Sequence, residues 1–239
     1  MSAQDCIKYP NLADKFNGKI TGLLAQKSES YGCKNFIYLS TVHVYKKPLL
    51  GTFNEKSPTT NSHPYAYSHL QGENALLKVA NKSSLTGTVL RLSNCFGYAL
   101  NEKSECWNLV VNEFIRDAFM HGKIKIKGDA SSKRDFLAIS ELNKVLLKII
   151  ENIDNVPQII NVSSGRSRTI LEVALKVAKE ADKLKEQATQ ILFDNESSNH
   201  MYLNIQNNSL DKIGINPNDD IATEIINTLN FLKLRESKK

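Results

Sequence analysis

Apolar residues recur along this chain at two spacings, and each spacing predicts a different kind of element. Helical spacing predicts an amphipathic helix over residues 10–30, carried by Leu12, Phe16, Ile20 and Leu23 or Leu24. It also predicts a helix over 65–83, with a core-facing set of Leu70, Leu76, Leu77 and Val79. Further helices are predicted over 107–121, 140–152, 169–183, 209–213 and 221–234.

Short apolar runs between these helices predict strands. Residues 35–40 form a continuous apolar run, the type that is buried on both faces of a parallel sheet. Other strands are predicted over 86–92, 123–127, 158–162 and 190–193. Because strands alternate with helices, the pattern predicts an α/β protein with a doubly wound parallel sheet, and a smaller α+β lobe from the later segments.

Candidate chemistry gathers where the strand over 35–40 ends and the next helix begins. The strand ends in the hydroxyl residues Ser40 and Thr41, and Tyr65 opens the helix. His69 lies one helical turn beyond Tyr65, on the same face. A hydroxyl and a phenol can converge on one substrate oxygen while a basic residue steadies the phenolate. The pattern therefore predicts proton transfer at a hydroxyl or keto group.

Five segments in order resemble motifs of the extended short-chain dehydrogenases/reductases, specifically the NAD-dependent nucleotide-sugar epimerase/dehydratase family typified by UDP-galactose 4-epimerase. They are 35–45 (NFIYLSTVHVY), 64–69 (PYAYSH), 91–97 (RLSNCFG), 134–136 (RDF) and 161–165 (NVSSG). One such motif is weak, but five in order are specific. The likeness covers nearly the whole chain and corresponds to the C-terminal two-thirds of such an enzyme.

The resemblance implies a division of the chain into two lobes. Residues 1–97 with about 135–165 would form the C-terminal half of a Rossmann-like domain, lacking the first strands and the Gly-rich turn. Residues from about 98–134 with 166–239 would form the substrate-binding lobe. The implied activity is oxidation of a nucleotide sugar by hydride transfer to NAD or NADP.

The resemblance also implies roles for individual residues. Thr41 would hydrogen-bond the sugar oxygen, Tyr65 would be the acid/base, and His69 stands at the position of the family's lysine. Ser40, Tyr65 and His69 would also contact the cofactor. The residues implied for binding a substrate such as a UDP-sugar are Asn94, Asn108, Leu109 and Arg134, the last as a clamp on the diphosphate.

Two departures from the family limit what this chain is expected to do. A neutral histidine at position 69 supplies positive charge only at acidic pH, so it does not lower the pKa of Tyr65 as a lysine would. The sequence also contains no Gly-x-x-Gly-x-x-Gly turn to hold a dinucleotide pyrophosphate. The chain resembles a domain that begins after its third or fourth strand. We therefore expect it to be inactive alone and doubtful as an NAD binder.

A sheet without its first half would leave an apolar strand edge that invites pairing. We expect marginal stability alone, or a partner that supplies the missing strands. The resemblance also implies a possible homodimer through the helices over 10–30 and 65–83.

Composition adds less to this picture. The net charge of +6 and pI of about 9.0 leave an anionic small molecule or nucleic acid open as a ligand. No basic-aromatic groove pattern supports nucleic acid. The four cysteines show no CxxC spacing or metal-site pattern, so no metal is expected and they are interpreted as reduced thiols. With no signal peptide or transmembrane run, we expect a cytoplasmic protein.

Other interpretations stay open. The chain is either a portion of a nucleotide-sugar enzyme or a non-catalytic remnant that still binds nucleotide sugars. Ser40 and Thr41 would then only cap the strand end, and His69 would face solvent. The remaining structural alternatives are a core-facing Tyr67 in place of Tyr65, a loop-holding Asn94, and a surface ion pair between Arg134 and Asp135.

Overall fold

The computed structural model describes residues 1–101, 104–194 and 202–237. The chain divides into two compact units. The first comprises Met1–Ser93, Val145–Ser163 and Ile205–Asn216, and the second comprises Asn94–Lys144, Ser164–Asn204 and Pro217–Lys239. The α/β class with parallel strands is confirmed, whereas the assignment of the lobes to cofactor and substrate stays a prediction.

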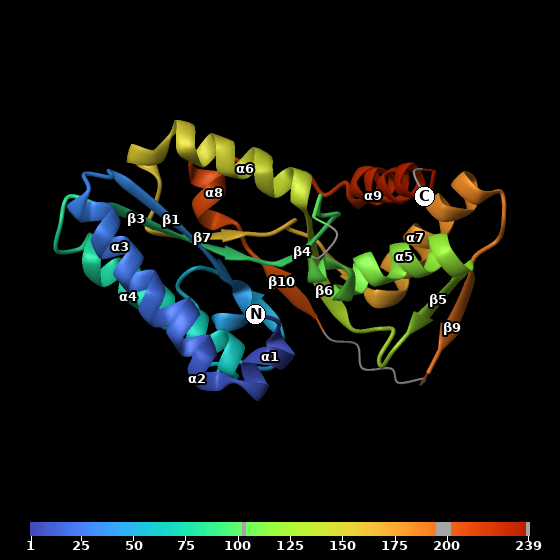
Figure 1. The fold of residues 1–239 in the computed structure, drawn as a ribbon, viewed down its shortest axis with the longest axis horizontal. Helices are drawn as coiled ribbons and strands as arrows, with labels where there is room; N and C mark the ends of the chain where they lie inside the picture. Colours follow the sequence, from blue (N-terminus) through green and yellow to red (C-terminus); the bar gives the residue numbers. More distant parts are fainter. Residues whose placement is uncertain (102–103, 195–201, 238–239) are drawn as a thin grey trace. The chain divides into compact units, whose positions relative to one another are not determined.

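The first unit is built on a parallel sheet of order β1-β3-β7. Its strands are β1 (Asn35–Thr41), β2 (Gly51–Phe53), β3 (Thr86–Leu92) and β7 (Ile159–Val162). Its helices are α1 (Ala3–Lys8), α2 (Pro10–Ala13), η1 (Asp14–Ile20), α3 (Thr21–Ser30), η2 (Val42–Val44), α4 (Pro64–Ala80), η4 (Ile153–Asn155) and α8 (Asn208–Lys212). Two elements cross the boundary between the units, α6 (Ile139–Glu151) and β10 (Leu203–Ile205). Helix α4 packs on β1 and β3, with α3 beside it (Figure 1).

The helix predicted over 10–30 is present, but its middle turn is a π-helix, η1, and its large apolar side chains are not in the core. Small residues face α4 instead. At Gly72 of α4, a Cβ would lie 2.2 Å from the carbonyl oxygen of Asn17, so only glycine allows this close approach. The large residues are left on the surface, with exposed fractions of 42% to 59% for Leu12, Phe16, Leu23 and Leu24.

None of residues 35–39 in strand β1 is fully buried, which corrects the prediction that this run is buried on both faces. Leu39 is 45% exposed, whereas Ser40 and Thr41 at the strand end are buried. In the order β1-β3-β7, β1 pairs with β3 on one side only among the described strands. An apolar run of this kind is typical of a strand inside a complete parallel sheet. Here the outer edge of β1 has no neighbour among the described strands.

A buried ion pair joins α4 to the sheet. Arg91 of β3 donates from Nη2 to Oε2 of Glu73 at 2.7 Å and from Nε to both carboxylate oxygens. Ser40, which is in register with Arg91, donates to Oε1 of Glu73 at 2.5 Å. Arg91 also donates to the phenol of Tyr45, and that phenol donates to Asn161 of β7 at 2.6 Å. One polar network therefore ties three strands to one helix.

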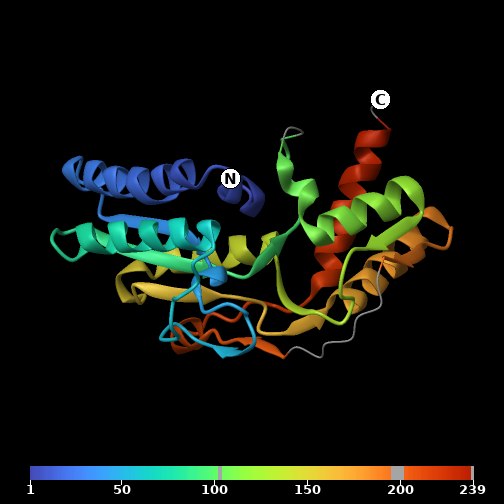
Figure 2. The same ribbon diagram turned by 90° about the horizontal axis from the view of Figure 1, so that it is seen from below.

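The second unit has its own core. Its strands are β4 (Asn94–Phe96), β5 (Lys123–Ile126), β6 (Lys133–Ala138), β8 (Ser167–Thr169) and β9 (Gln190–Phe193). Its helices are η3 (Glu105–Asn108), α5 (Val110–His121), α7 (Ile170–Lys185) and α9 (Ile221–Glu236). β4 pairs with β6 and β5 with β9 in parallel, whereas β6 pairs with β8 antiparallel. Figures 1 and 2 show α5, α7 and α9 packed together, around a cluster that includes Phe114, Ile115 and Val177.

Gly97 shows why the motif over 91–97 ends in glycine. Its φ is +138°, and a Cβ there would lie 2.4 Å from a side-chain carbon of Ile139. The buried amide of Asn112 on α5 brackets this residue, accepting from the Gly97 N–H at 3.0 Å and donating to its carbonyl at 2.7 Å. The glycine and the asparagine together fix the start of α5 against β4.

We predict that Glu73→Gln destabilises the protein by about 3–5 kcal/mol, because it leaves the buried guanidinium of Arg91 without a counter-charge. Urea unfolding followed by circular dichroism measures this. Lys19→Met is the control, since Lys19 pairs with Asp14 at the surface, at 3.8 Å, and its loss should cost less than about 1 kcal/mol. A double variant, Glu73→Leu with Arg91→Met, should be more stable than Glu73→Gln. Equal losses for Glu73→Gln and Lys19→Met would contradict the assigned role.

Candidate functional site

Tyr65, His69 and Tyr38 form a ring cluster between α4 and β1. The ring centroids of Tyr65 and His69 lie 4.7 Å apart, edge to face. The phenol oxygen of Tyr38 lies 3.1 Å from Nδ1 of His69. The interpretation of His69 as a solvent-facing residue is therefore wrong. The alternative that Tyr67 faces the core is also wrong, because Tyr67 is 51% exposed.

His69 is neutral near physiological pH. Its surroundings are largely apolar rings and helix, and burial lowers its pKa from 6.5 to about 4, with smaller contributions from the N-terminus and His43. Tyr38 donates its phenol proton to the carbonyl oxygen of Asn17 at 3.3 Å, and its oxygen can accept from His69 when the imidazole proton is on Nδ1. Burial raises the pKa of Tyr38, so the phenol keeps that proton. The position that carries a lysine in the resembled family thus supplies no charge to Tyr65 here.

The strand-end hydroxyls have structural bonds. Ser40 donates to Glu73 inside the buried network. The Thr41 hydroxyl oxygen accepts from the N–H of His43 at 3.2 Å and so caps the short turn η2. The Thr41 contact supports the capping role that was left open for it, whereas Ser40 bonds Glu73 of α4 and makes no capping contact. The turn also places the ring of His43 6.3 Å from that of Tyr65, edge to face.

The substrate-binding candidates lie in the second unit. The amide of Asn94 donates to the carbonyl of Asp135 at 2.8 Å, so it makes the expected type of side-chain-to-backbone bond, but this bond joins strands β4 and β6 instead of holding a loop. Asp135 is buried and accepts from the N–H and hydroxyl of Ser164, at 2.9 and 3.0 Å. Asp135 is buried and Arg134 forms no ion pair with it, so the predicted alternative of a surface ion pair between Arg134 and Asp135 is wrong.

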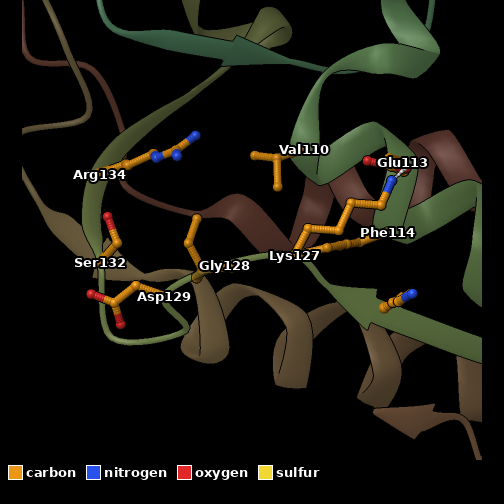
Figure 3. Close-up of a pocket in the computed structure, with 10 residues that line it drawn as sticks. Val110, Glu113, Phe114, Lys127, Gly128, Asp129, Ser132 and Arg134 are labelled. Carbon is orange, nitrogen blue, oxygen red and sulfur yellow. Dashed lines mark hydrogen bonds and ion pairs between the residues drawn. The ribbon is translucent and has the colours of Figure 1, made fainter. Parts of the chain in front are cut away.

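Arg134 lines a pocket of about 320 Å³ in the second unit (Figure 3). Its walls come from the start of α5, from β5 and the turn after it, and from β6. The lining residues are Val110, Glu113, Phe114, Lys125, Lys127, Gly128, Asp129, Ser132, Arg134 and Ile170. Asn108 ends η3 and Leu109 is the N-cap of α5; both are exposed and neither is among the lining residues, whereas the next residue, Val110, is.

The cations of this pocket differ in how they are paired. Lys127 donates to Glu113 at 2.6 Å, and Lys125 pairs with Asp194 at 2.8 Å. Among the described residues, no acid forms an ion pair with Arg134. Its guanidinium extends toward the side of the pocket where Val110 lies (Figure 3). A planar fork of donors beside the apolar Val110 and Phe114 suits a group that is anionic at one end and flat at the other.

Sequence reasoning missed several of these residues. Tyr38 sits inside an apolar strand, and nothing in its neighbours marks it as a partner of His69. Glu73 could have been found from the sequence, because it lies two turns after Tyr65 on the same helix face. The alternation over 123–127 also predicted that Lys125 and Lys127 lie on one face of a strand, and Lys127 directly follows the last residue of β5.

Comparison with known proteins identifies the family to which the chain belongs. Residues 2–163 match the model of the NAD dependent epimerase/dehydratase family. The chain belongs to this family. The resemblance inferred from five motifs is thereby confirmed.

Relatives of known name are distant. Over 155 residues the chain is 25% identical to dTDP-D-glucose 4,6-dehydratase of Mus musculus, covering 64% of this chain and 42% of that protein. The Bos taurus protein of the same name is 23% identical over 202 residues, covering 82% and 55%. The chain thus spans about half the length of the curated relatives it matches.

Solved structures share the fold. UDP-N-acetylglucosamine 4-epimerase from Methanobrevibacter ruminantium M1, in complex with UDP-N-acetylmuramic acid, superposes with a TM-score of 0.83 at 22% identity, covering 98% of this chain and 74% of that one. UDP-glucose 4-epimerase from Thermotoga maritima, with UDP-glucose, gives 0.81 at 20% identity, covering 100% and 75%.

The family is NAD-dependent, and solved neighbours hold NAD or NADPH. The residues of this chain provide only part of what is needed to bind NAD or NADPH. The eleven glycines include no Gly-x-x-Gly-x-x-Gly run, and His69 is neutral and bonded to Tyr38.

Within residues 1–101, 104–194 and 202–237, no cluster of three metal-ligating side chains is found. No described helix is both long enough and apolar enough to cross a membrane.

We predict that His69 makes the protein less stable as the pH falls from about 6.5 to about 4. In this window the unfolded chain binds a proton that the folded chain excludes, so stability is lost on acidification and is unaffected by His69 above the window. The loss is roughly 3 kcal/mol. Urea unfolding of the wild type and His69→Gln from pH 8 to 4 measures it.

The variant should lose less stability than the wild type within this window. His121→Gln is the matched control, because His121 is exposed at the end of α5. Parallel pH curves for the wild type and His69→Gln would show that His69 is not desolvated.

Proposed function

We propose that this chain is the nucleotide-sugar-binding portion of an epimerase/dehydratase, and that by itself it does not transfer hydride. The pocket around Arg134 carries this proposal. It lies within one unit and combines a cation that has no described counter-ion with an apolar wall. A UDP-sugar has the complementary features, a diphosphate for the guanidinium and a flat base for the wall.

The neighbours support this ligand class. Solved relatives of the same fold hold UDP-glucose or UDP-N-acetylmuramic acid. Arg134 follows β5 and its turn and lies on β6, so its backbone is held by the β4–β6 and β6–β8 pairs. A rigid guanidinium loses little entropy on binding, which favours recognition of an anion. We also propose Asn108 and Leu109, just before α5, as substrate contacts. Asn94 is a further proposed contact, although its amide also donates to the carbonyl of Asp135.

Tyr65 is the proposed acid/base, with Thr41 as the proposed hydrogen-bond donor to the sugar oxygen. A free phenol has a pKa near 10, so it needs a nearby positive charge to act as a base at neutral pH. His69 supplies none, since burial holds its pKa at about 4. The chain therefore keeps the proton-transfer residue and lacks the charge that would activate it.

A second candidate function is a non-catalytic nucleotide-sugar-binding module. The observation that favours it is the hydrogen bond between the neutral His69 and Tyr38 of β1. This bond occupies Nδ1 of the imidazole, so that atom is not available to bind the ribose of a cofactor. The two candidates share the Arg134 pocket and differ in whether a cofactor ever reaches Tyr65. We also propose that the protein is cytoplasmic.

Association with another chain is part of the proposal. Leu12, Phe16, Leu23 and Leu24 are large apolar side chains exposed on α2, η1 and α3. This surface and the outer edge of β1 would be covered either in a homodimer through these helices and α4, or by a partner that supplies further strands. Burial of such side chains is the usual driving force for a stable interface.

We predict that UDP binds this chain and that Arg134→Met weakens the binding about tenfold or more, because a charge-assisted bidentate contact is lost. Isothermal titration calorimetry measures the dissociation constant. Lys133→Met is the matched control, since it removes an equal charge from the neighbouring position, which does not line the pocket. Its effect should stay within about twofold. Equal affinity for the wild type and Arg134→Met would place the nucleotide elsewhere.

We predict that the isolated chain does not shift the fluorescence of NADH, and that His69→Lys does not restore a shift, because no Gly-rich turn is present to hold the pyrophosphate. The same sample should bind UDP, which shows that it is folded. Sedimentation velocity on this sample reports its association state. A saturable NADH signal would show that a cofactor site exists and would favour the enzyme over the binding module.

A further inference from the structure

A second cavity lies in the first unit, at the start of α4. Its volume is about 430 Å³, within the range of small-molecule sites. The lining residues are Lys46, Lys47, Thr60, Asn61, Ser62 and His63. They come from two segments, the turn after β1 and the loop that leads into α4, so the cavity is separate from the pocket that contains Arg134.

The lining is cationic and has no acid. Lys46 and Lys47 bring two ammonium groups, and the other four lining residues are Thr60, Asn61, Ser62 and His63. Neither lysine forms an ion pair with any residue of the described part of the chain. Both residues are exposed, so their charge faces the cavity and solvent without internal neutralisation. Two unneutralised cations beside one cavity favour an anion.

The other lining groups are donors. Nδ1 of His63 accepts the N–H of Tyr65 at 3.2 Å, so the neutral ring carries its proton on Nε2 and presents a donor there. Thr60 and Ser62 add two exposed hydroxyls. Asn61 is buried and holds the wall, donating to the His43 carbonyl at 2.7 Å and accepting from the His63 N–H at 3.0 Å. The cavity therefore combines two cations and three donor groups on a braced loop.

We propose that this cavity binds a phosphate group, held by Lys46, Lys47 and the Nε2–H of His63. Phosphate is the anion that matches these groups, because its several oxygens can accept from two ammonium groups and from neutral donors at once. The ligand is either free inorganic phosphate or the phosphate of a larger molecule. This inference does not depend on the proposed nucleotide-sugar function.

The site lies next to Tyr65. His63 is the N-cap of α4 and precedes Tyr65 by two positions, and Asn61 connects the cavity wall to His43, whose ring lies 6.3 Å from that of Tyr65. A dianion bound there adds negative charge near the phenol, so phosphate would raise the pKa of Tyr65 and make it a weaker base at neutral pH. Occupancy of the cavity would thus oppose ionisation of the residue proposed as acid/base.

The test is a titration of the full chain with inorganic phosphate at pH 8 and constant ionic strength, followed by NMR of the backbone amides over 46–47 and 60–63. We expect saturable shifts at these positions with phosphate and none with chloride. Lys46→Met with Lys47→Met should weaken the affinity at least about tenfold. His63→Asn keeps a side chain suited to the N-cap and should weaken it by about two- to fivefold.

Lys78→Met with Lys82→Met is the matched control. These lysines are exposed at the far end of α4 and just beyond it, and their loss changes the net charge equally. The affinity of this variant should stay within about twofold of the wild type. Unchanged phosphate affinity in the Lys46/Lys47 variant, or no saturation in the millimolar range, would overturn the proposal.

A parallel titration with UDP identifies the source of the phosphate. If the Lys46/Lys47 variant loses phosphate binding and keeps UDP binding, the cavity takes a phosphate independent of the nucleotide. If it loses both, the cavity takes the diphosphate of the nucleotide itself, and the Arg134 pocket is not the main nucleotide site. Either result supports a phosphate site at Lys46 and Lys47.

Discussion

The buried pair between Glu73 and Arg91 sets the geometry of everything on the first unit's sheet. Two opposite charges taken out of water are tolerated only when their hydrogen bonds are complete, and here Ser40 and Tyr45 complete them. The pair therefore fixes one face of α4 against β1 and β3 at a single register. Tyr65 and His69 lie on that same face, two turns and one turn before Glu73. Their positions are a consequence of where the carboxylate must sit.

The same constraint determines the protonation of His69. A side chain held one turn from Glu73 faces Tyr38 on β1 and is largely removed from water, so its neutral form is favoured. A lysine at this position would bring a charge that must be solvated by a ligand or by the phenol. A histidine avoids that cost and forms a neutral hydrogen bond. With histidine in place of the family's lysine, the chain keeps the packing around Tyr65 but lacks the positive charge that would activate it.

The sequence predicted the order and type of most long elements because their hydrophobic periods are clear, as in α5, α6 and α7. Local spacing does not reveal which face of an amphipathic segment meets a neighbour. In η1 and α3, Gly18, Thr21 and Ala25 allow close packing on α4, so the large apolar residues lie outside. An exposed strand edge was expected from the resemblance, but the exposure of Leu39 within the apolar run of β1 was not. Motif order identified Tyr65, His69 and Arg134, whereas Tyr38 and the Lys46–Lys47 cavity depend on contacts between segments distant in sequence.

The two cavities differ in how their cations are paired, in a chain with a net charge of +6. In the second unit's pocket, Lys125 and Lys127 are paired with Asp194 and Glu113, so Arg134 is the cation left to meet a ligand. In the first unit's cavity, no acid lines the walls, and Lys46 and Lys47 form no ion pair with a described residue. Both cavities therefore present a small number of localised cations instead of a continuous basic surface. That arrangement favours compact anions such as phosphates over the extended backbone of a nucleic acid, which needs many aligned charges.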